Sequence, residues 1–220
     1  MKNLQDTPLQ RVQFKTESFL DVVTRIPSEP KEVYLLLHGL QERGKRIYRK
    51  LRSAIPEDAV ILAPNGSYPL PSLKNGETRY TYAWYFYDRA SQTYHIDQKY
   101  PVAQLKHMIE ALNLSHLPLT IIGFSQGGYL APFVGQELKQ TKHVIGIGCE
   151  FRTPLLKKDY PFKITAVHGA DDKIILPEWA KKEVDYLKSQ NIDCEFHLVP
   201  ETGHEITPQA ANVIAEILRK

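Results

Sequence analysis

The sequence lacks the features that would place it in several large classes of protein. Only two of its 220 residues are cysteines, Cys149 and Cys194, which excludes a disulfide framework, and they do not form a close metal-ligand pair. Neither sign of charge dominates, because 28 Lys and Arg stand against 25 Asp and Glu. A net charge of +3 is too even for a protein that binds nucleic acid or a membrane through a basic surface. Long apolar runs are also missing, since a run such as Val33–Leu37 is far shorter than the roughly 20 residues of a transmembrane helix.

The N-terminal segment MKNLQDTPLQRVQFKTE has no apolar core of the kind found in signal peptides, so we expect a cytoplasmic protein. What the chain does contain is typical of a globular protein, with 42% apolar and 24% charged residues. Its length allows one hydrophobic core that buries roughly 70% of the surface of the unfolded chain. We therefore interpret residues 1–220 as a single domain.

Short apolar runs alternate with stretches of helical spacing. The runs are Val33–Leu37, Val60–Leu62, Leu119–Ile122, Val144–Ile147, Ile164–Val167 and Phe196–Val199. Each is almost continuously apolar, as expected of strands buried on both faces of a parallel sheet. The helical stretches are residues 47–55, 102–112, 129–138, 180–187 and 210–218. This alternation predicts an α/β fold with a mostly parallel, doubly wound sheet and helices on both faces.

Two segments fall outside this alternation. The apolar residues before Pro30, from Phe14 to Ile26, could add one or two antiparallel strands at an edge of the sheet. Residues 64–98 have no clear periodicity and contain the aromatic run YTYAWYFYD, from Tyr80 to Asp88. A stretch of this length inside a domain is usually functional or disordered, and its aromatic residues argue against disorder. We therefore interpret residues 64–98 as an aromatic-rich loop insertion.

The sharpest local signal is the segment GFSQGG, which runs from Gly123 to Gly128. It follows an apolar run and precedes a helical stretch. A G-x-S-x-G pattern between a strand and a helix is typical of a nucleophile elbow, a tight turn that projects the serine hydroxyl above the sheet. Glycine stands two residues to either side of Ser125 because larger side chains would collide where strand and helix approach each other. The pattern predicts that Ser125 is a nucleophile.

A serine hydroxyl needs a base to remove its proton, and the base needs an acid to orient it. On folds with this elbow the acid and then the histidine follow the serine in the chain. Four histidines follow Ser125: His143, His168, His197 and His204. His204 lies in the loop between the last apolar run and the last helical stretch, where a loop can bring an imidazole to the serine. His204 is therefore the predicted base.

The acid is expected in the loop after the run Ile164–Val167, which offers Asp171 and Asp172. Asp172 is favoured, and Asp171 stays open as its neighbour. Glu150 is a third candidate, because some proteins with this elbow place the acid after the preceding strand. Replacing the true acid by its amide is expected to be far more damaging than replacing a carboxylate on the surface.

Two backbone N–H groups should stabilise the oxygen that becomes negative during the reaction. One is the N–H of Gln126, the residue after the nucleophile. The other is expected in the segment Leu37-His38-Gly39-Leu40, which follows the first buried strand, and the Leu40 N–H is the predicted donor. We expect His38 to tie down this loop rather than to act on the substrate.

These motifs resemble the carboxylesterase/phospholipase family of small α/β hydrolases, the group that includes acyl-protein thioesterases. The matching segments are LHGL (37–40), GFSQGG (123–128), HGADDKIILP (168–177) and GHEI (203–206), in the order and at the spacing of the family. The resemblance implies a single-domain α/β-hydrolase fold without a large cap domain, and it implies neither a metal nor an organic cofactor. It also implies a triad and an oxyanion hole made by Ser125, Asp172, His204, Leu40 and Gln126.

The spacing within HG-x-x-D in that family, counted from His168, selects Asp172 over Asp171. The resemblance is less specific for the substrate. Trp84 and Tyr85 are similar to a segment that lines the pocket in the family, so they are our candidate substrate-binding aromatic residues. We therefore expect the aromatic-rich segment 64–98 to lie near the active site. Alternate residues of this segment are expected to pack on the sheet instead.

The segment Gly148-Cys149-Glu150-Phe151-Arg152 departs from the small or apolar loop of the family. It adds Glu150 as a further candidate for substrate binding and argues against a purely lipid-like substrate. Alternatively, Glu150 and Arg152 pair with each other on the surface.

The sequence predicts a serine hydrolase of the carboxylesterase or acyl-thioesterase type. It would cleave esters or thioesters with short-to-medium acyl or aryl groups through an acyl-enzyme intermediate. One alternative is a peptidase or amidase with the same triad, although such enzymes on this fold generally carry an extra specificity domain. Another is a catalytically silent binding protein with a hydrolase fold. The expected partner is a small-molecule ester or thioester and not nucleic acid, and the expected state is a monomer or homodimer.

Overall fold

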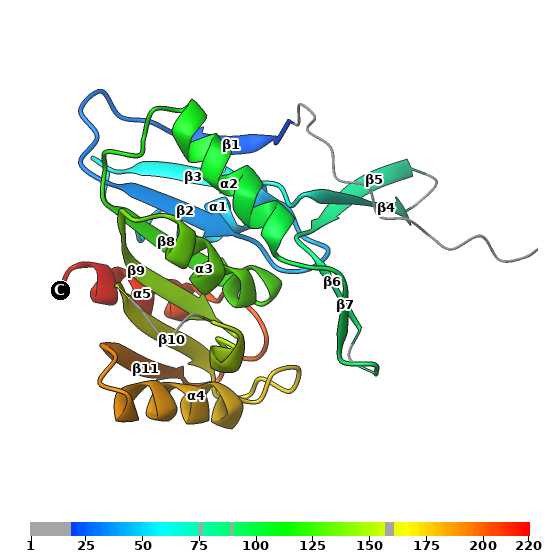
Figure 1. Ribbon diagram of the computed structural model, residues 1–220, viewed down its shortest axis with the longest axis vertical. Helices are drawn as coiled ribbons and strands as arrows, with labels where there is room; N and C mark the ends of the chain where they lie inside the picture. Colours follow the sequence, from blue (N-terminus) through cyan, green and yellow to red (C-terminus); the bar gives the residue numbers. More distant parts are fainter. Residues whose placement is uncertain (1–18, 75–76, 89, 157–160) are drawn as a thin grey trace, which may run out of the picture.

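Seven strands form the central sheet of the protein. The computed structural model describes residues 19–74, 77–88, 90–156 and 161–220. The strands of this sheet are β1 (Val22–Arg25), β2 (Val33–Leu37), β3 (Val60–Pro64), β8 (Leu119–Phe124), β9 (Thr141–Ile147), β10 (Lys163–Gly169) and β11 (Cys194–Val199). Their spatial order is β1-β3-β2-β8-β9-β10-β11 (Figure 1). All neighbours are parallel except β1, which pairs antiparallel with β3.

Every predicted buried run lies inside one of these strands, so the prediction of a mostly parallel sheet is confirmed. The expected antiparallel edge strand before Pro30 is β1, with Val22 opposite Pro64. Phe14, at the start of the predicted edge segment, lies outside the described residues. Strand β11 is the other edge of the sheet and is only partly buried; Leu198 is 51% exposed.

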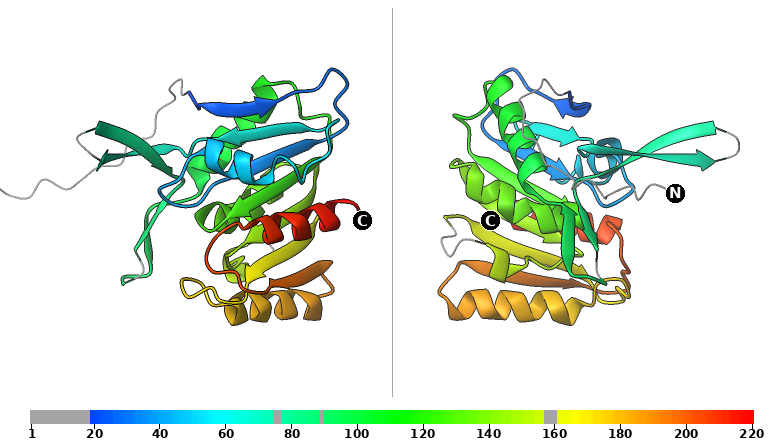
Figure 2. Two further views of the ribbon diagram at one scale, coloured as in Figure 1. Left: turned by 180° about the vertical axis from the view of Figure 1, so that it is seen from behind. Right: turned by 45° about the vertical axis from the view of Figure 1, so that its right-hand side comes forward.

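In the described ranges, five α-helices cover the two faces of the sheet. They are α1 (Gly44–Leu51), α2 (Lys99–Ala111), α3 (Gln126–Glu137), α4 (Pro177–Ser189) and α5 (Pro208–Leu218). Helices α2, α3 and α4 lie on one face, and α1 and α5 lie on the other (Figures 1 and 2). The sequence explains why α5 begins at Pro208. The Thr207 side chain caps the helix by accepting a hydrogen bond from the Ala210 N–H at 3.2 Å, and proline suits the first turn because an N–H there would have no partner within the helix.

The sheet divides the hydrophobic core into two layers because successive side chains of a strand point to opposite faces. In β2, Leu35 and Leu37 belong to the layer under α2, α3 and α4, whereas Tyr34 and Leu36 belong to the layer under α1 and α5. All five residues of β2 are buried. This burial on both faces explains why the strand is a continuous apolar run in the sequence.

The prediction of a loop over residues 64–98 is wrong in one respect, because this region forms two antiparallel hairpins. Strand β4 (Tyr68–Lys74) pairs with β5 (Glu77–Ala83), and β6 (Phe86–Asp88) pairs with β7 (Thr93–Ile96). Prolines at positions 69 and 71 hid the strand pattern, since proline is uncommon in strands except at the edge of a sheet. Asn75-Gly76, which stands between β4 and β5 in the sequence, is a typical hairpin signal that could have revealed the pairing.

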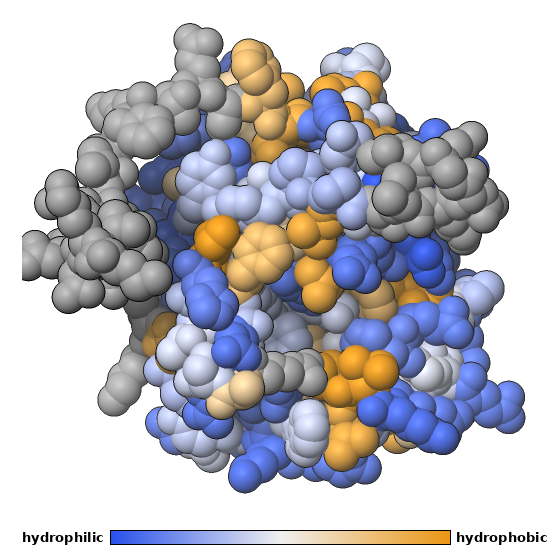
Figure 3. Space-filling view, turned by 90° about the vertical axis from the view of Figure 1, so that its right-hand side faces the viewer, coloured by the Kyte–Doolittle hydropathy of each residue, from blue (hydrophilic) through white to orange (hydrophobic). Residues whose placement is uncertain are grey.

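The two hairpins project from the side of the sheet where the parallel strands end at their carboxyl termini, on the right in Figure 1. In the space-filling view of this side, hydrophobic and hydrophilic residues lie next to one another rather than in one large apolar patch (Figure 3). Loops after parallel strands meet at this edge, which is where ligands bind in open α/β sheets. Within the described ranges, no helix has the length and apolar character needed to cross a membrane.

The contact between α3 and β2 generates a prediction on stability. A Cβ atom at Gly127 would lie 2.2 Å from the carbonyl oxygen of Leu37, a backbone atom that cannot move aside easily. We expect Gly127→Ala to lower the free energy of unfolding by about 1–3 kcal/mol, measured by urea unfolding. Gly203→Ala is the control, because the nearest atom to its Cβ would be 3.9 Å away. Equal unfolding midpoints for the two variants would contradict the close contact.

Candidate active site

Ser125 occupies a strained turn between β8 and α3. Its backbone has φ 48° and ψ −117°, a conformation that residues other than glycine rarely adopt. The turn is held by a hydrogen bond from the Ser125 N–H to the Ile147 carbonyl oxygen at 2.8 Å. A Cβ atom at Gly123 would lie 2.3 Å from the Gly127 carbonyl oxygen, so only glycine permits this approach. The structure therefore has the strand–turn–helix geometry of a nucleophile elbow.

Three side chains from three separate loops form a chain of hydrogen bonds. The His204 Nε2 atom lies 3.0 Å from Ser125 Oγ, and the His204 Nδ1 atom lies 2.7 Å from Asp172 Oδ2. A carboxylate can only accept, so Nδ1 carries the proton and Nε2 is left to accept from the serine hydroxyl. This tautomer is the one that allows an imidazole to act as a base toward serine.

Asp172 is fixed and almost completely buried, with 2% of its surface exposed. Its Oδ1 atom accepts hydrogen bonds from the backbone N–H groups of Ile174 at 2.9 Å and Ile175 at 3.0 Å. These bonds hold the carboxylate in one orientation and leave Oδ2 for His204. Asp171 is exposed to solvent, which agrees with the choice of Asp172 from the sequence.

The loop that carries His204 packs closely against the loop of the acid. The Asp171 N–H donates to the Thr202 carbonyl oxygen at 2.9 Å, and a Cβ atom at Gly169 would lie 2.2 Å from that same oxygen. The ring of Phe124 lies beside the His204 ring, tilted by 38°, with centroids 5.1 Å apart. The imidazole is therefore positioned by backbone contacts below it and by an aromatic ring beside it.

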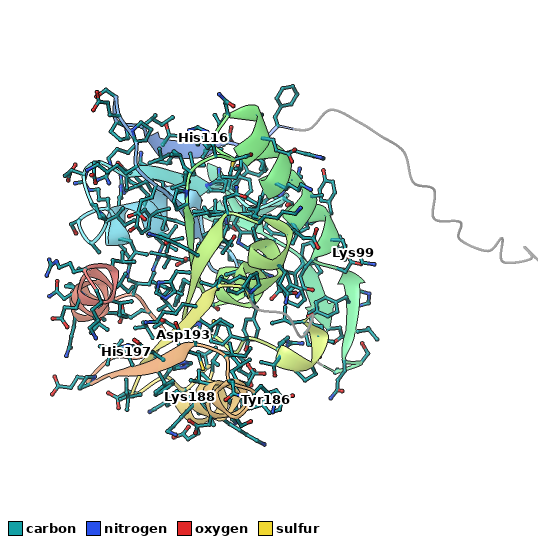
Figure 4. The ribbon with its side chains drawn as sticks, turned by 60° about the vertical axis from the view of Figure 1, so that its left-hand side comes forward. Lys99, His116, Tyr186, Lys188, Asp193 and His197 are labelled. Atoms are coloured by element: carbon teal, nitrogen blue, oxygen red, sulfur yellow. The ribbon has the colours of Figure 1, made fainter. Side chains whose placement is uncertain are left out.

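The other three histidines after Ser125 bond elsewhere. His143 Nε2 lies 2.8 Å from Thr165 Oγ1, and His197, which lies on the edge strand β11 (Figure 4), bonds to Glu195 at 3.0 Å. His168 is buried behind the acid, where its Nε2 lies 2.8 Å from the Ile175 carbonyl oxygen and 3.3 Å from Asp172 Oδ2. The sequence reasoning missed this supporting position of His168, although its place in HG-x-x-D was visible.

The backbone N–H groups of Leu40 and Gln126 lie in the two segments expected to form an oxyanion hole. Both residues line one cavity with Ser125 and His204. Among the described residues neither N–H has a hydrogen-bond partner, which leaves both available to a ligand. The Gln126 side chain fixes the aromatic segment as well, because it accepts from the Trp84 N–H and donates to the Tyr85 carbonyl oxygen, both at 2.9 Å.

His38 holds the loop that carries Leu40, as expected from the sequence. Its Nδ1 atom lies 2.7 Å from the Gly39 carbonyl oxygen, and its Nε2 accepts from the Gly66 N–H at 2.8 Å. Burial lowers the pKa of His38 from 6.5 to about 4, so the ring is neutral at physiological pH. A neutral ring matches these bonds, since one nitrogen must donate and the other must accept.

The cavity above Ser125 has a volume of about 450 Å³, and aromatic side chains form part of its wall. Its aromatic lining residues are Tyr85, Phe86, Tyr87, Phe124 and Tyr129. Its charged lining residues are Glu42 and Arg152. The Glu42 carboxylate is already bonded to Arg46 at 2.7 Å and to the Gly39 N–H at 3.2 Å.

Two of the three predicted substrate-binding residues do not reach this cavity. Trp84 is completely buried, and its Nε1–H donates to the His38 carbonyl oxygen at 2.8 Å, so it supports the cavity from below. Glu150 accepts a hydrogen bond from the Tyr129 hydroxyl at 3.0 Å and lines a separate surface pocket. Tyr85 does line the cavity, and Arg152 takes the place expected for Glu150. Within the described part of the chain no ion pair joins Glu150 to Arg152, so the alternative that they pair with each other is wrong.

The comparisons with known proteins agree with this geometry. The chain matches the model of the phospholipase/carboxylesterase family over residues 21–220. The chain belongs to this family. Over 200 residues it is 24% identical to acyl-protein thioesterase 1 homolog 1 of Dictyostelium discoideum, covering 84% of this chain and 82% of the relative. The protein is therefore a hydrolase of the carboxylesterase and thioesterase type.

Solved structures of other proteins have the same fold as this chain. The crystal structure of esterase PE8 superposes with a TM-score of 0.72 at 20% identity and covers 91% of this chain and 98% of that one. Zea mays acyl-protein thioesterase 2 superposes with a TM-score of 0.69 at 18% identity and covers 92% and 98% of the two chains. At these identities the likeness shows a common single-domain α/β-hydrolase fold.

No group of three or more His, Cys, Asp or Glu side chains is placed to hold a metal ion in the ranges that the structure describes. The Ser125 hydroxyl lies beside the His204 imidazole, and Leu40 and Gln126 line the same cavity. The chemistry that it supports is acyl transfer to serine.

The acid of this arrangement can be tested by replacing it with its amide. Asp172→Asn cannot hold His204 in the tautomer that accepts from Ser125, so we expect kcat to fall on the order of 10⁴-fold, as in serine proteases. Asp171→Asn is the matched control and should change kcat less than about threefold, because an exposed carboxylate contributes little. Glu150→Gln should retain at least about a tenth of the activity. Steady-state kinetics with one ester substrate would measure all three, and a collapse of Glu150→Gln with an active Asp172→Asn would place the acid on the earlier strand.

His38 makes the stability of the fold depend on pH. Its pKa is about 4 when folded and close to 6.5 when unfolded, so below pH 6.5 the unfolded chain binds a proton that the folded chain does not. The free energy of unfolding should therefore fall as the pH drops from about 6.5 to about 4, by on the order of 3 kcal/mol from this residue. Urea unfolding of the wild type and of His38→Gln should show a difference in stability that shrinks across this window. A constant difference from pH 7 to pH 4 would mean that His38 does not titrate as described.

Proposed function

We propose that the protein is a serine esterase or thioesterase in which Ser125, His204 and Asp172 form the catalytic triad. Ser125 Oγ attacks the carbonyl carbon of the substrate while His204 Nε2 accepts the hydroxyl proton. The N–H groups of Leu40 and Gln126 stabilise the oxyanion of the tetrahedral intermediate. His204 then donates the proton to the leaving oxygen or sulfur, and an acyl-enzyme on Ser125 remains.

Water completes the cycle by the same route in reverse. His204 removes a proton from a water molecule, which attacks the acyl carbonyl carbon and forms a second tetrahedral intermediate. Collapse of that intermediate releases the carboxylic acid and returns the proton to Ser125 Oγ. Asp172 holds the imidazole in place throughout and stabilises its positive charge in both halves of the reaction.

The observation that carries this proposal is the hydrogen-bonded chain from Asp172 through His204 to Ser125, at 2.7 Å and 3.0 Å, in a strained elbow at the base of a cavity. A strained backbone at a residue other than glycine has an energetic cost and is typical of functional positions. This combination of a strained serine and a hydrogen-bonded imidazole and carboxylate favours an enzyme over a silent binding protein.

The cavity supports substrates with short-to-medium acyl or aryl groups. Its volume of about 450 Å³ is at the small end for sites that bind small molecules, and its aromatic wall suits an apolar group. We propose that Tyr85, Phe86 and Tyr87 contact this group, while Trp84 supports them from beneath. A cytoplasmic location and a monomeric or homodimeric state stay predictions.

The nucleophile can be identified by covalent labelling. A fluorophosphonate probe should label the wild type once per chain, and peptide mapping should place the adduct on Ser125, because the His204 imidazole lies within hydrogen-bond distance of its hydroxyl. The Ser125→Ala variant should neither be labelled nor hydrolyse p-nitrophenyl esters and acyl thioesters from acetyl to octanoyl. Ser67→Ala, in the loop between β3 and β4, is the control and should behave as the wild type. An adduct on a serine other than Ser125 would overturn the proposal.

A further inference from the structure

Arg152 places a positive charge in the cavity that contains Ser125. The residue follows β9 and lines the same cavity as Ser125 and His204. Its backbone is in the left-handed region, with φ 50° and ψ 49°. Arginine has no local preference for this conformation, which therefore needs support from the surrounding structure.

That support comes from Glu183 on α4. The Glu183 carboxylate accepts hydrogen bonds from the backbone N–H groups of Phe151 and Arg152, the latter at 3.0 Å. The Phe151 side chain is completely buried beside this contact. The Glu183 carboxylate therefore binds the backbone of this segment and not the Arg152 guanidinium. It fixes the direction of the arginine but does not form an ion pair with its side chain in the described structure.

The guanidinium of Arg152 lies among aromatic rings instead. Its central carbon is 4.3 Å from the centre of the Tyr87 ring and 5.2 Å from that of the Tyr129 ring. The Tyr94 hydroxyl lies 3.5 Å from one of its nitrogens, a long and weak contact. Although burial opposes the charge, a hydrogen bond with the Tyr87 side chain and the electrostatic effect of Tyr94, Tyr85 and Tyr87 hold the pKa of Arg152 above its ordinary value. Among the described residues, the contacts of this half-buried cation are therefore with tyrosine side chains.

No carboxylate pairs with this cation in the described part of the chain. Three carboxylates lie around this part of the cavity, and each binds another group. Glu150 accepts from the Tyr129 hydroxyl, Glu183 binds the backbone, and Glu42 binds Arg46. A guanidinium has five N–H donors in a fixed plane, a geometry that matches a carboxylate. Most of these donors have no strong acceptor in the described structure.

We propose that Arg152 binds a carboxylate carried by the substrate, so that the enzyme prefers esters or thioesters that contain a second, acidic group. This inference rests on the proposed function, because it assigns the substrate class of the same site. A singly charged carboxylate fits better than a phosphate, since the cavity offers one guanidinium and also contains the acidic Glu42. The carboxylate can belong to the acyl group or to the alcohol.

The test compares paired substrates that differ only in this charge. For the acyl side the pair is mono-p-nitrophenyl adipate and p-nitrophenyl hexanoate. For the alcohol side the pair is 4-acetoxybenzoate and its methyl ester. In at least one pair, the ratio of kcat/KM for the acid over the neutral ester should fall about 10- to 100-fold on Arg152→Met, the range expected for a hydrogen-bonded ion pair. The pair that responds identifies which side of the substrate carries the carboxylate.

Two variants sharpen this test. Lys182→Met removes a positive charge from an exposed position on α4 outside the cavity, and it should leave both ratios unchanged. Arg152→Lys keeps the charge without the planar fork and should give an intermediate ratio. Because each ratio is measured on one sample, partial unfolding of a variant does not alter it.

A change of less than about threefold in both ratios on Arg152→Met would overturn the inference, because a lost ion pair of this kind should exceed it. If the wild type hydrolyses the neutral esters and the fluorophosphonate adduct maps to Ser125, that result leaves the proposed function standing. If the wild type cleaves none of the four esters and is not labelled, the proposed function fails, and the inference fails with it.

Discussion

The closeness of β2, β8 and α3 is the constraint on which the rest of the site depends. Gly123 and Gly127 allow backbone atoms to approach where any Cβ would collide, at 2.3 Å and 2.2 Å from carbonyl oxygens. Because of this approach the chain must turn sharply at Ser125, in a conformation that costs energy. The same contact aligns the N-terminus of α3 with the end of β2. The hydroxyl of Ser125 and the N–H groups of Leu40 and Gln126 therefore share one small volume.

The remaining parts of the site follow from the parallel sheet. Strands β8, β10 and β11 end at the same edge, so the loops that carry Ser125, Asp172 and His204 meet there although they are far apart in the sequence. Each loop is fixed by backbone hydrogen bonds rather than by its own side chains alone. The carboxylate of Asp172 is held by two N–H groups, and its burial removes competing water. Rigid support of this kind is what a preorganised site requires.

The charge of Arg152 in the cavity is arranged differently from the charge of Asp172 beside His204. Asp172 is buried with several donors around it, whereas Arg152 is half-buried against Tyr87 and Tyr129 without a carboxylate partner in the described residues. Aromatic rings stabilise a cation only in part, so a ligand with a negative charge gains more from this position than a neutral one. The aromatic wall and the single cation together favour a substrate with an apolar segment and an acidic end.

The sequence by itself determined the type of fold and most of the groups at its centre. Buried parallel strands must be continuously apolar, so β2, β3, β8, β9 and β10 were visible as runs, and the tight turn at Ser125 requires glycines at fixed positions. The hairpins β4–β5 and β6–β7 were missed because strands with prolines and aromatic residues lack the clear alternation of a half-buried sheet. The direction of individual side chains was decided only by tertiary structure. Trp84 points into the core and Arg152 into the cavity because of Gln126, His38 and Glu183, which are distant in the sequence and become neighbours only when the chain is folded.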